Sequence, residues 1–381
     1  MKGCLFFIFF FCGVTLATAQ NNKATILQFV FTSDAHYGVV RPFFRGQANV
    51  TGQEVNLAML QKINSLPTAV LPEDGGVAAG KTAGPIDFIV EGGDIANRME
   101  IPVQSATISW QQFEADYLHK INLTDHAGKP TQLMIIPGNH DITNAIGHYK
   151  TMSPKTDASS MAGIYNLMMK PDVALTKESY QYNIHKIHYS KNIGGIHFMF
   201  INLWPDSAER IWMKKDLRKI SRKKPVIIFS HDQPESEAKH FSNPNNLPFN
   251  ATDKFENLLT EHYKDFAKAK TDGGKTALEQ TGWERFIKRH GNIKAYFHGN
   301  SNWNQFYEYT GIKNEISLHV FRVDSPMKGK YSAKDETRLS FHVITIDTLL
   351  RRMTVRECLW NTEPKNAAAS VQWGESKTVT Y

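Results

Sequence analysis

Short, mostly apolar runs that stop abruptly at polar residues recur along the chain. The clearest of them cover residues 26–31, 86–90, 133–136, 225–229 and 293–297. A nearly continuous apolar run of this length, ended by polar or turn-forming residues, is typical of a strand buried on both faces. The sequence therefore predicts five buried strands, each followed by polar side chains just beyond its carboxyl end.

Helical periodicity separates several of these predicted strands. Thr51 and Glu54 have the spacing of a capping box, which marks the first turn of a helix. Aromatic residues recur at helical spacing over residues 110–117, and a further helix is expected near residues 161–169. Buried strands that alternate with helices predict an α/β fold, in which ligands bind where the strands end.

The second half of the chain also contains weaker strand patterns. They lie at residues 180–189, 196–204, 306–309, 316–321, 339–346 and 353–359. Because they alternate less strictly, or follow one another without helices, we expect them to complete a second sheet. Residues 361–381 are polar with no clear period, so the pattern leaves their structure open.

Length and composition are those of an ordinary globular protein, with 381 residues of which 41% are hydrophobic. Since no repeat or long linker interrupts the chain, we expect one large domain over residues 20–360 and a polar C-terminal tail at residues 361–381. The formal net charge of +7 favours anionic ligands only weakly. The basic run at residues 214–224 is typical of a solvated helix end, so no stable nucleic-acid partner is expected, and the oligomeric state is left open.

The N-terminus has the pattern of a secretory signal over residues 1–19. Lys2 precedes an apolar stretch at residues 5–16, and small residues at 17–19 form the cleavage site. The apolar stretch is shorter than the roughly 20 residues that a membrane span needs. We therefore expect a secreted or periplasmic protein with no membrane span, in which Cys358 remains the only cysteine and forms no internal disulfide.

Carboxylate, imidazole and amide side chains follow the five predicted buried strands. The candidate metal ligands among them are Asp34, His36, Asp94, Asn139 and His231. Oxygen and nitrogen donors without thiolate suit Mn, Fe or Zn. Taken singly, each residue has a simpler explanation, such as a helix cap or a core histidine. Their shared position at strand ends favours a metal site.

The ordered motifs of the chain resemble those of the calcineurin-like metallophosphoesterases. The family has D-x-H, G-D, G-N-H-D/E, a lone H and G-H-x-H; this chain has Asp34-Ala35-His36, Gly93-Asp94, Gly138-Asn139-His140-Asp141 and His231 in the same order. The resemblance implies a four-layer α/β/β/α sandwich with two mixed sheets and two divalent metal ions. It places Asp34, His36 and Asp94 on one ion and Asp94, Asn139 and His231 on the other, with His140 over the leaving group as an acid or charge stabiliser.

Two positions depart from the family pattern. Where the family has G-H-x-H, this chain has Gly299-Asn300-Ser301-Asn302, so amides replace both imidazoles and each metal loses one nitrogen donor. Asn97 stands where purple acid phosphatases have a metal-binding Tyr and protein phosphatases an Asp that orients the catalytic His. Arg98, which follows it, either clamps the substrate phosphate or pairs on the surface.

The favoured interpretation is a secreted, metal-dependent phosphoesterase that uses a metal-activated water to hydrolyse a phosphomonoester or a phosphodiester. The first alternative is a hydrolytically impaired metal- or phosphate-binding protein on the same scaffold, motivated by Asn300 and Asn302. A carbohydrate- or nucleic-acid-binding module is the third, motivated only by the basic run and by Trp303, Tyr307 and Tyr309. Turnover of chromogenic phosphate esters with added metal distinguishes these interpretations.

Overall fold

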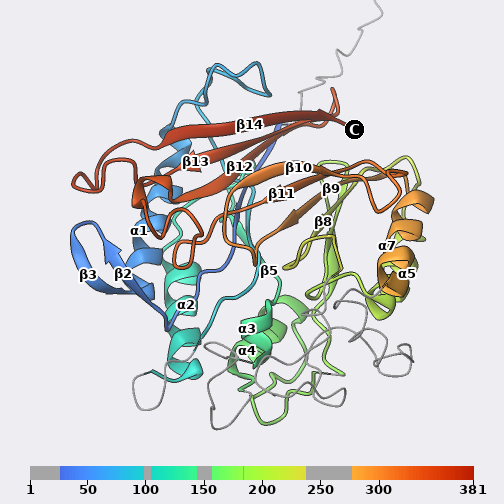
Figure 1. The fold of residues 1–381 in the computed structure, drawn as a ribbon, viewed down its shortest axis with the longest axis horizontal. Helices are drawn as coiled ribbons and strands as arrows, with labels where there is room; N and C mark the ends of the chain where they lie inside the picture. Colours follow the sequence, from blue (N-terminus) through green and yellow to red (C-terminus); the bar gives the residue numbers. More distant parts are fainter. Residues whose placement is uncertain (1–25, 98–103, 144–156, 183, 237–276) are drawn as a thin grey trace, which may run out of the picture.

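The computed structural model describes residues 26–97, 104–143, 157–182, 184–236 and 277–381. In these residues, two six-stranded sheets stack face to face, and helices cover their outer faces (Figure 1). This arrangement is the predicted α/β/β/α sandwich. The predicted signal at residues 1–19 lies outside the described residues, and no helix in the described part of the chain is long and apolar enough to cross a membrane.

The first sheet has the strand order β14-β13-β12-β1-β4-β5. Its strands are β1 (Ile26–Thr32), β4 (Phe88–Glu91), β5 (Gln132–Ile135), β12 (Ser340–Asp347), β13 (Arg352–Leu359) and β14 (Gln372–Thr380). Strands β1, β4 and β5 are parallel, with Phe29 opposite Phe88 and Ile89 opposite Leu133. Their carboxyl ends therefore reach the same edge of the sheet.

The second sheet has the order β10-β11-β9-β8-β7-β6. Its strands are β6 (Tyr189–Ile193), β7 (Ile196–Phe200), β8 (Val226–Phe229), β9 (Ile293–His298), β10 (Gln305–Tyr309) and β11 (Leu318–Arg322). The four central strands are parallel, and β6 and β10 are antiparallel edges. The carboxyl ends of β8 and β9 therefore also meet at one edge.

The helices form the outer layers. On the first sheet lie α1 (Gly52–Ser65), α2 (Ala106–His119) and α4 (Ser159–Met169), and on the second lie α5 (Ser207–Leu217) and α7 (Ala277–Arg289). Helix α1 begins with the predicted capping box, since the side chain of Thr51 accepts from the Glu54 N–H and the Glu54 carboxylate accepts from the Thr51 N–H. Short helices α3 (Asn139–Thr143), η1 (Leu66–Thr68) and η5 (Glu336–Arg338) complete the set in the described residues.

The two sheets are held together by an aromatic core. Phe29 stacks on Phe88 with ring centroids 4.5 Å apart and meets Phe229 edge-on at 5.9 Å. Phe31 meets Phe297 edge-on at 5.5 Å, so β1 and β9 lie against each other across the sandwich. Close packing of these rings fixes the relative position of the sheets, and with it the strand ends that carry the candidate ligands.

The C-terminal strands differ from the prediction. We expected the predicted strands between residues 306 and 359 to complete the second sheet, but only β10 and β11 do so, whereas β12 and β13 extend the first. Strand β12 pairs antiparallel with β1, in a register that places Ile26 opposite Asp347 and Phe31 opposite His342. Apolar alternation shows that a segment is a strand but carries no information about its partner, so the sequence could not assign these strands to a sheet.

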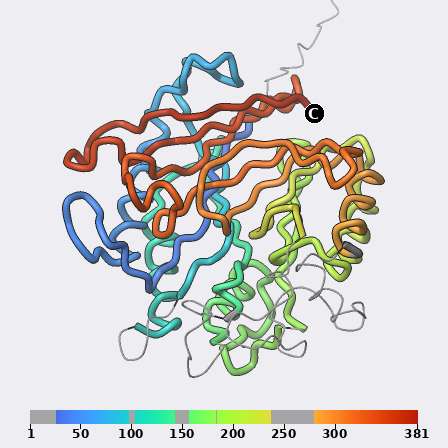
Figure 2. The backbone as a smooth tube through the Cα atoms, in the orientation of Figure 1, coloured from blue at the N-terminus to red at the C-terminus, as the bar shows by residue number. Residues whose placement is uncertain are grey.

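Residues 361–381, which the sequence left open, include an edge strand of the first sheet. Strand β14 pairs antiparallel with β13, and Figure 2 shows it running along that strand before the chain ends. Its side chains are mostly exposed, because an edge strand has little to cover it. The sheet of the domain therefore extends to Thr380, beyond the predicted boundary at residue 360.

Two other segments also differ from the sequence pattern. Residues 180–182 and 184–188 are turn and irregular structure instead of a strand, because the Tyr180 hydroxyl donates to the His185 carbonyl and the Gln181 N–H donates to the His185 imidazole. Strands β2 (Val40–Phe44) and β3 (Gln47–Thr51) form a hairpin in a stretch that we interpreted as loop before α1.

Candidate metal centre

The loops that follow five strands converge at one edge of the sandwich. Asp34 and His36 follow β1, Asp94 follows β4, His140 lies in α3 after β5, His231 follows β8, and Asn300 and Asn302 follow β9. Ligand atoms of Asp34, Asp94 and His231 all lie within 4.8 Å of one another, and the three side chains are buried. The structure thus brings together Asp34 and His231, which are 197 positions apart in the sequence (231 − 34).

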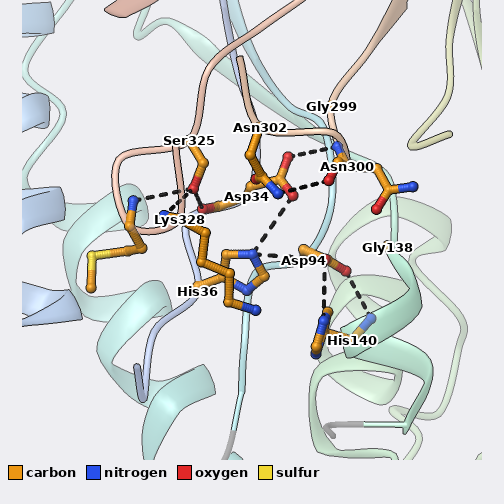
Figure 3. A network of polar contacts seen from close by, with 12 residues as sticks. Asp34, His36, Asp94, Gly138, His140, Gly299, Asn300, Asn302, Ser325 and Lys328 are labelled. Atoms are coloured by element: carbon orange, nitrogen blue, oxygen red, sulfur yellow. Dashed lines mark hydrogen bonds and ion pairs between the residues drawn. The ribbon is translucent and has the colours of Figure 1, made fainter. Parts of the chain in front are cut away.

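Asp94 lies at the centre of this group (Figure 3). Its Oδ1 is 3.4 Å from Nε2 of His231, and its Oδ2 is 3.8 Å from Nε2 of His36 and 3.9 Å from Nε2 of His140. The Oδ1 atom also accepts a hydrogen bond from the His140 backbone N–H at 2.7 Å. One carboxylate therefore faces three imidazoles from three different loops.

The electrostatics of the centre favour positive charge. Burial raises the pKa of Asp94, but His231, His140 and His36 outweigh that effect and hold it well below its usual range. Burial lowers the pKa of His231, yet the carboxylates of Asp94, Asp34 and Asp232 raise it to about 10. The two shifts are the two sides of one attraction, because the Asp94 carboxylate and the imidazoles around it favour each other's charged forms in a site with little solvent.

Four polar atoms of the centre are buried without a hydrogen-bond partner in the described part of the chain. They are Asp34 Oδ1, His36 Nε2, His231 Nε2 and Asn302 Oδ1. A buried polar atom without a partner costs about 1–3 kcal/mol, so four such atoms in one place need an explanation. Divalent metal binding provides one, since these are oxygen and nitrogen donors of the kind that Mn, Fe and Zn accept. The residues present therefore fit the implied metal ions.

Hydrogen bonds orient two of the histidines toward the centre. His36 Nδ1 lies 2.6 Å from Asn97 Oδ1, and His231 Nδ1 lies 2.8 Å from the Gly92 carbonyl oxygen. Both partners are acceptors, so each Nδ1 carries a proton and each Nε2 is the ring nitrogen that faces the centre. Such contacts fix the tautomer and the ring orientation of metal-binding histidines.

Asn97 also orients His140, in the opposite tautomer. Its Nδ2 lies 2.9 Å from His140 Nδ1, and because an amide N–H donates, His140 Nδ1 accepts and Nε2 carries the proton. The rings of His36 and His140 meet edge-on at 5.2 Å. The Asn97 amide thus orients His36, a candidate metal ligand, on one side and His140, a candidate proton donor, on the other.

The two asparagines in place of the family's histidines lie at the centre in different ways. The Asn302 side chain donates to the Asn300 carbonyl at 2.7 Å and leaves its own Oδ1 without a partner. The side chain of Asn300 donates to the Asp232 carboxylate, and its backbone N–H donates to Asp34 Oδ2 at 2.9 Å. Asn302 therefore offers a donor oxygen, whereas the amide of Asn300 is engaged by Asp232.

The backbone of the centre is locally strained. Five of its residues have positive φ angles, namely Asp34 (59°), His36 (44°), Asp94 (57°), Asn300 (59°) and Asn302 (62°). Such conformations cost of order 1–3 kcal/mol each and are concentrated at functional sites. Asn and Asp adopt them more readily than most residues, which suits the two asparagines to the loop after β9.

Gly93 and Asp141 allow the loops after β4 and β5 to lie close together. At Gly93, with φ of +98°, a Cβ atom would lie 2.5 Å from the Gly138 nitrogen and 2.8 Å from His231 Nδ1. The Asp141 carboxylate accepts from the N–H groups of Gly138 at 2.8 Å and of Ile95 and Ala96 at 3.0 Å. Asp141 therefore fastens the loop after β4 to the loop after β5.

The remaining predicted site residues are placed as follows. Asn139 is partly exposed at the first position of α3, directly before His140. Arg98 lies outside the described residues, so its predicted phosphate contact stays a prediction. His298 is not a predicted site residue; it is buried at the end of β9 and hydrogen-bonds the Tyr307 hydroxyl at 3.3 Å.

Sequence reasoning did not assign roles to several residues of the centre. In the sequence, Asn97 is notable only because it departs from the pattern of related families, and Asp141 only because it completes the motif over residues 138–141. Asp232 directly follows His231 and could have been noticed by that adjacency. Lys328 lies in a loop after β11 with no motif around it, and no local signal pointed to it.

The chain is similar to known proteins in sequence pattern and in fold. A sequence model of the family described as calcineurin-like phosphoesterase matches residues 27–299. A dimetal phosphatase from Danio rerio has a similar structure over 93% of this chain and 99% of its own, with a TM-score of 0.50 and 9% identity. Phosphopantetheinyl hydrolase from Mycobacterium tuberculosis aligns over 80% of this chain and 91% of its own, with a TM-score of 0.32 and 10% identity. No curated protein matches this chain by sequence.

The chain belongs to the calcineurin-like phosphoesterase family, because the family match spans most of its length. It is a metal-dependent phosphoric ester hydrolase with a buried Asp/Asp/His group suited to a divalent metal. The likeness to the Danio rerio phosphatase, at 9% identity, supports the shared fold.

Proposed function

We propose that this protein is a secreted or periplasmic enzyme that hydrolyses a phosphomonoester or phosphodiester with two divalent ions, which are Mn, Fe or Zn. The observation that carries the proposal is the position of Asp94, whose two oxygens face His231 on one side and His36 and His140 on the other. A carboxylate in this position can bridge two ions. The N-terminal pattern of residues 1–19 supports export.

Different residues of the centre would bind the metal ions and transfer the proton. Bound divalent ions supply positive charge to the phosphoryl oxygens and lower the pKa of water. Asp34 and Asp94 would hold those ions through oxygens, and His36 and His231 would hold them through Nε2 atoms whose orientation Asn97 and Gly92 fix.

His140 takes part in the proton transfer. It presents an Nε2–H group, and this group donates to the leaving oxygen, which acquires negative charge as the P–O bond breaks.

The proposal is tested by metal content and turnover of the purified protein. Elemental analysis is expected to find two divalent ions per chain after loading with Mn, Zn or Fe. Loaded protein is expected to release 4-nitrophenol from 4-nitrophenyl phosphate or from bis(4-nitrophenyl) phosphate, and chelated protein is not. Full metal content with no turnover of either ester would contradict the enzyme and favour a binding protein.

Asn300 and Asn302 favour that second candidate, a metal- or phosphate-binding protein with impaired hydrolysis. Each amide replaces an imidazole that the family pattern would supply. The aromatic residues that motivated a carbohydrate- or nucleic-acid-binding module are engaged in packing. The Arg322 Cζ atom lies 3.8 Å and the Lys330 Nζ atom 4.2 Å from the centroid of the Trp303 ring. The Tyr307 hydroxyl hydrogen-bonds His298. We therefore do not propose that module.

The variant Asn300→His/Asn302→His is expected to bind Zn about tenfold or more tightly and to turn over esters faster. Imidazole suits Zn better than an amide oxygen does, and changes around a metal site alter affinity by about 10–100-fold. Position 302 already presents an unpartnered donor atom to the centre, and Asp232 could accept from an imidazole at position 300.

Zn titration and turnover of the parent, both single variants and the double variant provide the measurement. The Asn302→His single variant is expected to give most of the gain, because the Asn300 side chain is oriented by Asp232. A double variant no better than the parent in either assay would mean that these positions do not ligate metal, or that the surrounding side chains have adapted to amides.

A further inference from the structure

The loop over residues 323–333, which follows β11, is fastened to the metal centre. The Val323 N–H donates to the His298 carbonyl at 3.1 Å, at the end of β9. The Ser325 hydroxyl donates to the Asp34 carbonyl at 2.9 Å, and the Lys330 N–H donates to the Asn302 carbonyl at 2.6 Å. These contacts join the loop to two residues of the centre itself, so its position is set by the same backbone that holds Asp34 and Asn302.

A buried arginine holds the loop from the other side. Arg41 of β2 donates to the Pro326 carbonyl at 2.8 Å and to the Ser332 carbonyl, and its side chain is buried. Asp324 is buried in the same loop and lies close enough to Arg41 for electrostatic attraction. A buried guanidinium that bonds two carbonyls keeps both ends of the loop in one place.

This anchored loop carries Lys328 into the centre. The Lys328 N–H donates to the Ser325 hydroxyl at 2.9 Å, and Figure 3 shows its side chain extending toward His36 and the carboxylates. Burial lowers the pKa of Lys328, while Asp94 and Asp34 act in the opposite direction. Within the described residues its ammonium forms no ion pair, so a cation is held beside the metal centre without a dedicated carboxylate.

We propose that Lys328 binds the phosphate group of the substrate and favours phosphomonoesters over phosphodiesters. This inference rests on the proposed function. A monoester dianion has three non-bridging oxygens and about two negative charges, whereas a diester has two such oxygens and one charge. An ammonium group has three N–H donors. A fixed extra cation therefore contributes more to binding the monoester, both by Coulomb attraction and by hydrogen bonding.

Lys330 provides a matched control in the same loop. It is also a lysine and lies two residues further along, but it is exposed, and its ammonium lies over the Trp303 ring at 4.2 Å. The variants Lys328→Met and Lys330→Met each remove one charge from the same loop and keep side-chain length. Only the first removes a cation that extends to the metal centre.

Lys328→Met is expected to raise KM for 4-nitrophenyl phosphate by about 10–100-fold, the range of one charge-assisted hydrogen bond. KM for bis(4-nitrophenyl) phosphate is expected to change by less than about threefold, and kcat for both esters to change less than KM does. Inhibition by inorganic phosphate should weaken in parallel with the monoester KM. Metal content should equal that of the parent, Lys330→Met should match the parent in every measurement, and Lys328→Arg should restore part of the loss.

Four results would overturn the inference. Parent-like KM values for both esters would mean that Lys328 does not contact the phosphate. Equal losses for the two esters would remove the preference for monoesters. Loss of metal from a folded Lys328→Met variant would mean that the ammonium supports the centre instead of the substrate. Unchanged inhibition by inorganic phosphate would contradict phosphate binding.

Calorimetric titration with inorganic phosphate separates this inference from the proposed function. If the metal-loaded parent hydrolyses no ester but binds phosphate, and Lys328→Met binds it about tenfold or more weakly, the function fails and the role of Lys328 stands. If the parent turns over monoesters and the two proteins bind phosphate equally, the function stands and the role of Lys328 fails.

Discussion

Asp94→Asn is expected to remove metal from both positions of the centre and to lower turnover by more than about 10³-fold, since each bound ion contributes several kcal/mol of charge stabilisation. The substitution removes the negative charge that lies between His231, His36 and His140. It also places an amide N–H where a donor oxygen stood. The variant therefore loses a charged contact to each of these three imidazoles.

Elemental analysis of the purified variant, together with kcat for the best ester, measures this effect. Asp172→Asn is a suitable control, because it makes the same change at an exposed carboxylate. Thermal unfolding of metal-free parent and variant shows whether the fold is retained. If Asp94→Asn keeps two metal ions per chain, the bridging assignment is wrong, whatever happens to activity.

His140→Ala is expected to lower kcat by about 10²–10⁴-fold for esters with poor leaving groups and to leave metal content nearly unchanged. The structure supplies the physical reason, because Asn97 donates to Nδ1 and so keeps the proton on Nε2, the atom that faces Asp94 at 3.9 Å. Removing the imidazole removes that proton donor while Asp94, His36 and His231 remain.

The test compares 4-nitrophenyl phosphate, which has a good leaving group, with phenyl phosphate, which has a poor one. An acid role predicts a much larger loss for phenyl phosphate, since phenoxide needs the proton more. His126→Ala is the matched control, because His126 is exposed and pairs with Asp87 away from the centre. Equal losses for both esters would argue against proton donation and leave stabilisation of phosphoryl charge.

Most of the residues that the structure brings together at this edge carry local signals in the sequence. An apolar run that ends in polar residues predicts both a buried strand and the point where its side chains leave the sheet. That reasoning placed Asp34, Asp94 and His231 at the ends of separate strands, and the parallel pairing of β1 with β4 makes the ends that carry Asp34 and Asp94 adjacent. The capping box at Thr51 was equally local, and it was found where expected.

Tertiary structure decided everything that depends on contacts between distant segments. Only pairing with β1 assigned β12 to the first sheet, and only the folded loops reveal that Asn97 bonds to both His36 and His140. Ser325, which is 291 residues from Asp34, donates a hydrogen bond to that residue's carbonyl and is one of the contacts that hold the loop carrying Lys328 beside the centre. Such contacts leave no periodic trace in the sequence, because each depends on how separate elements pack and not on the spacing of neighbours along the chain.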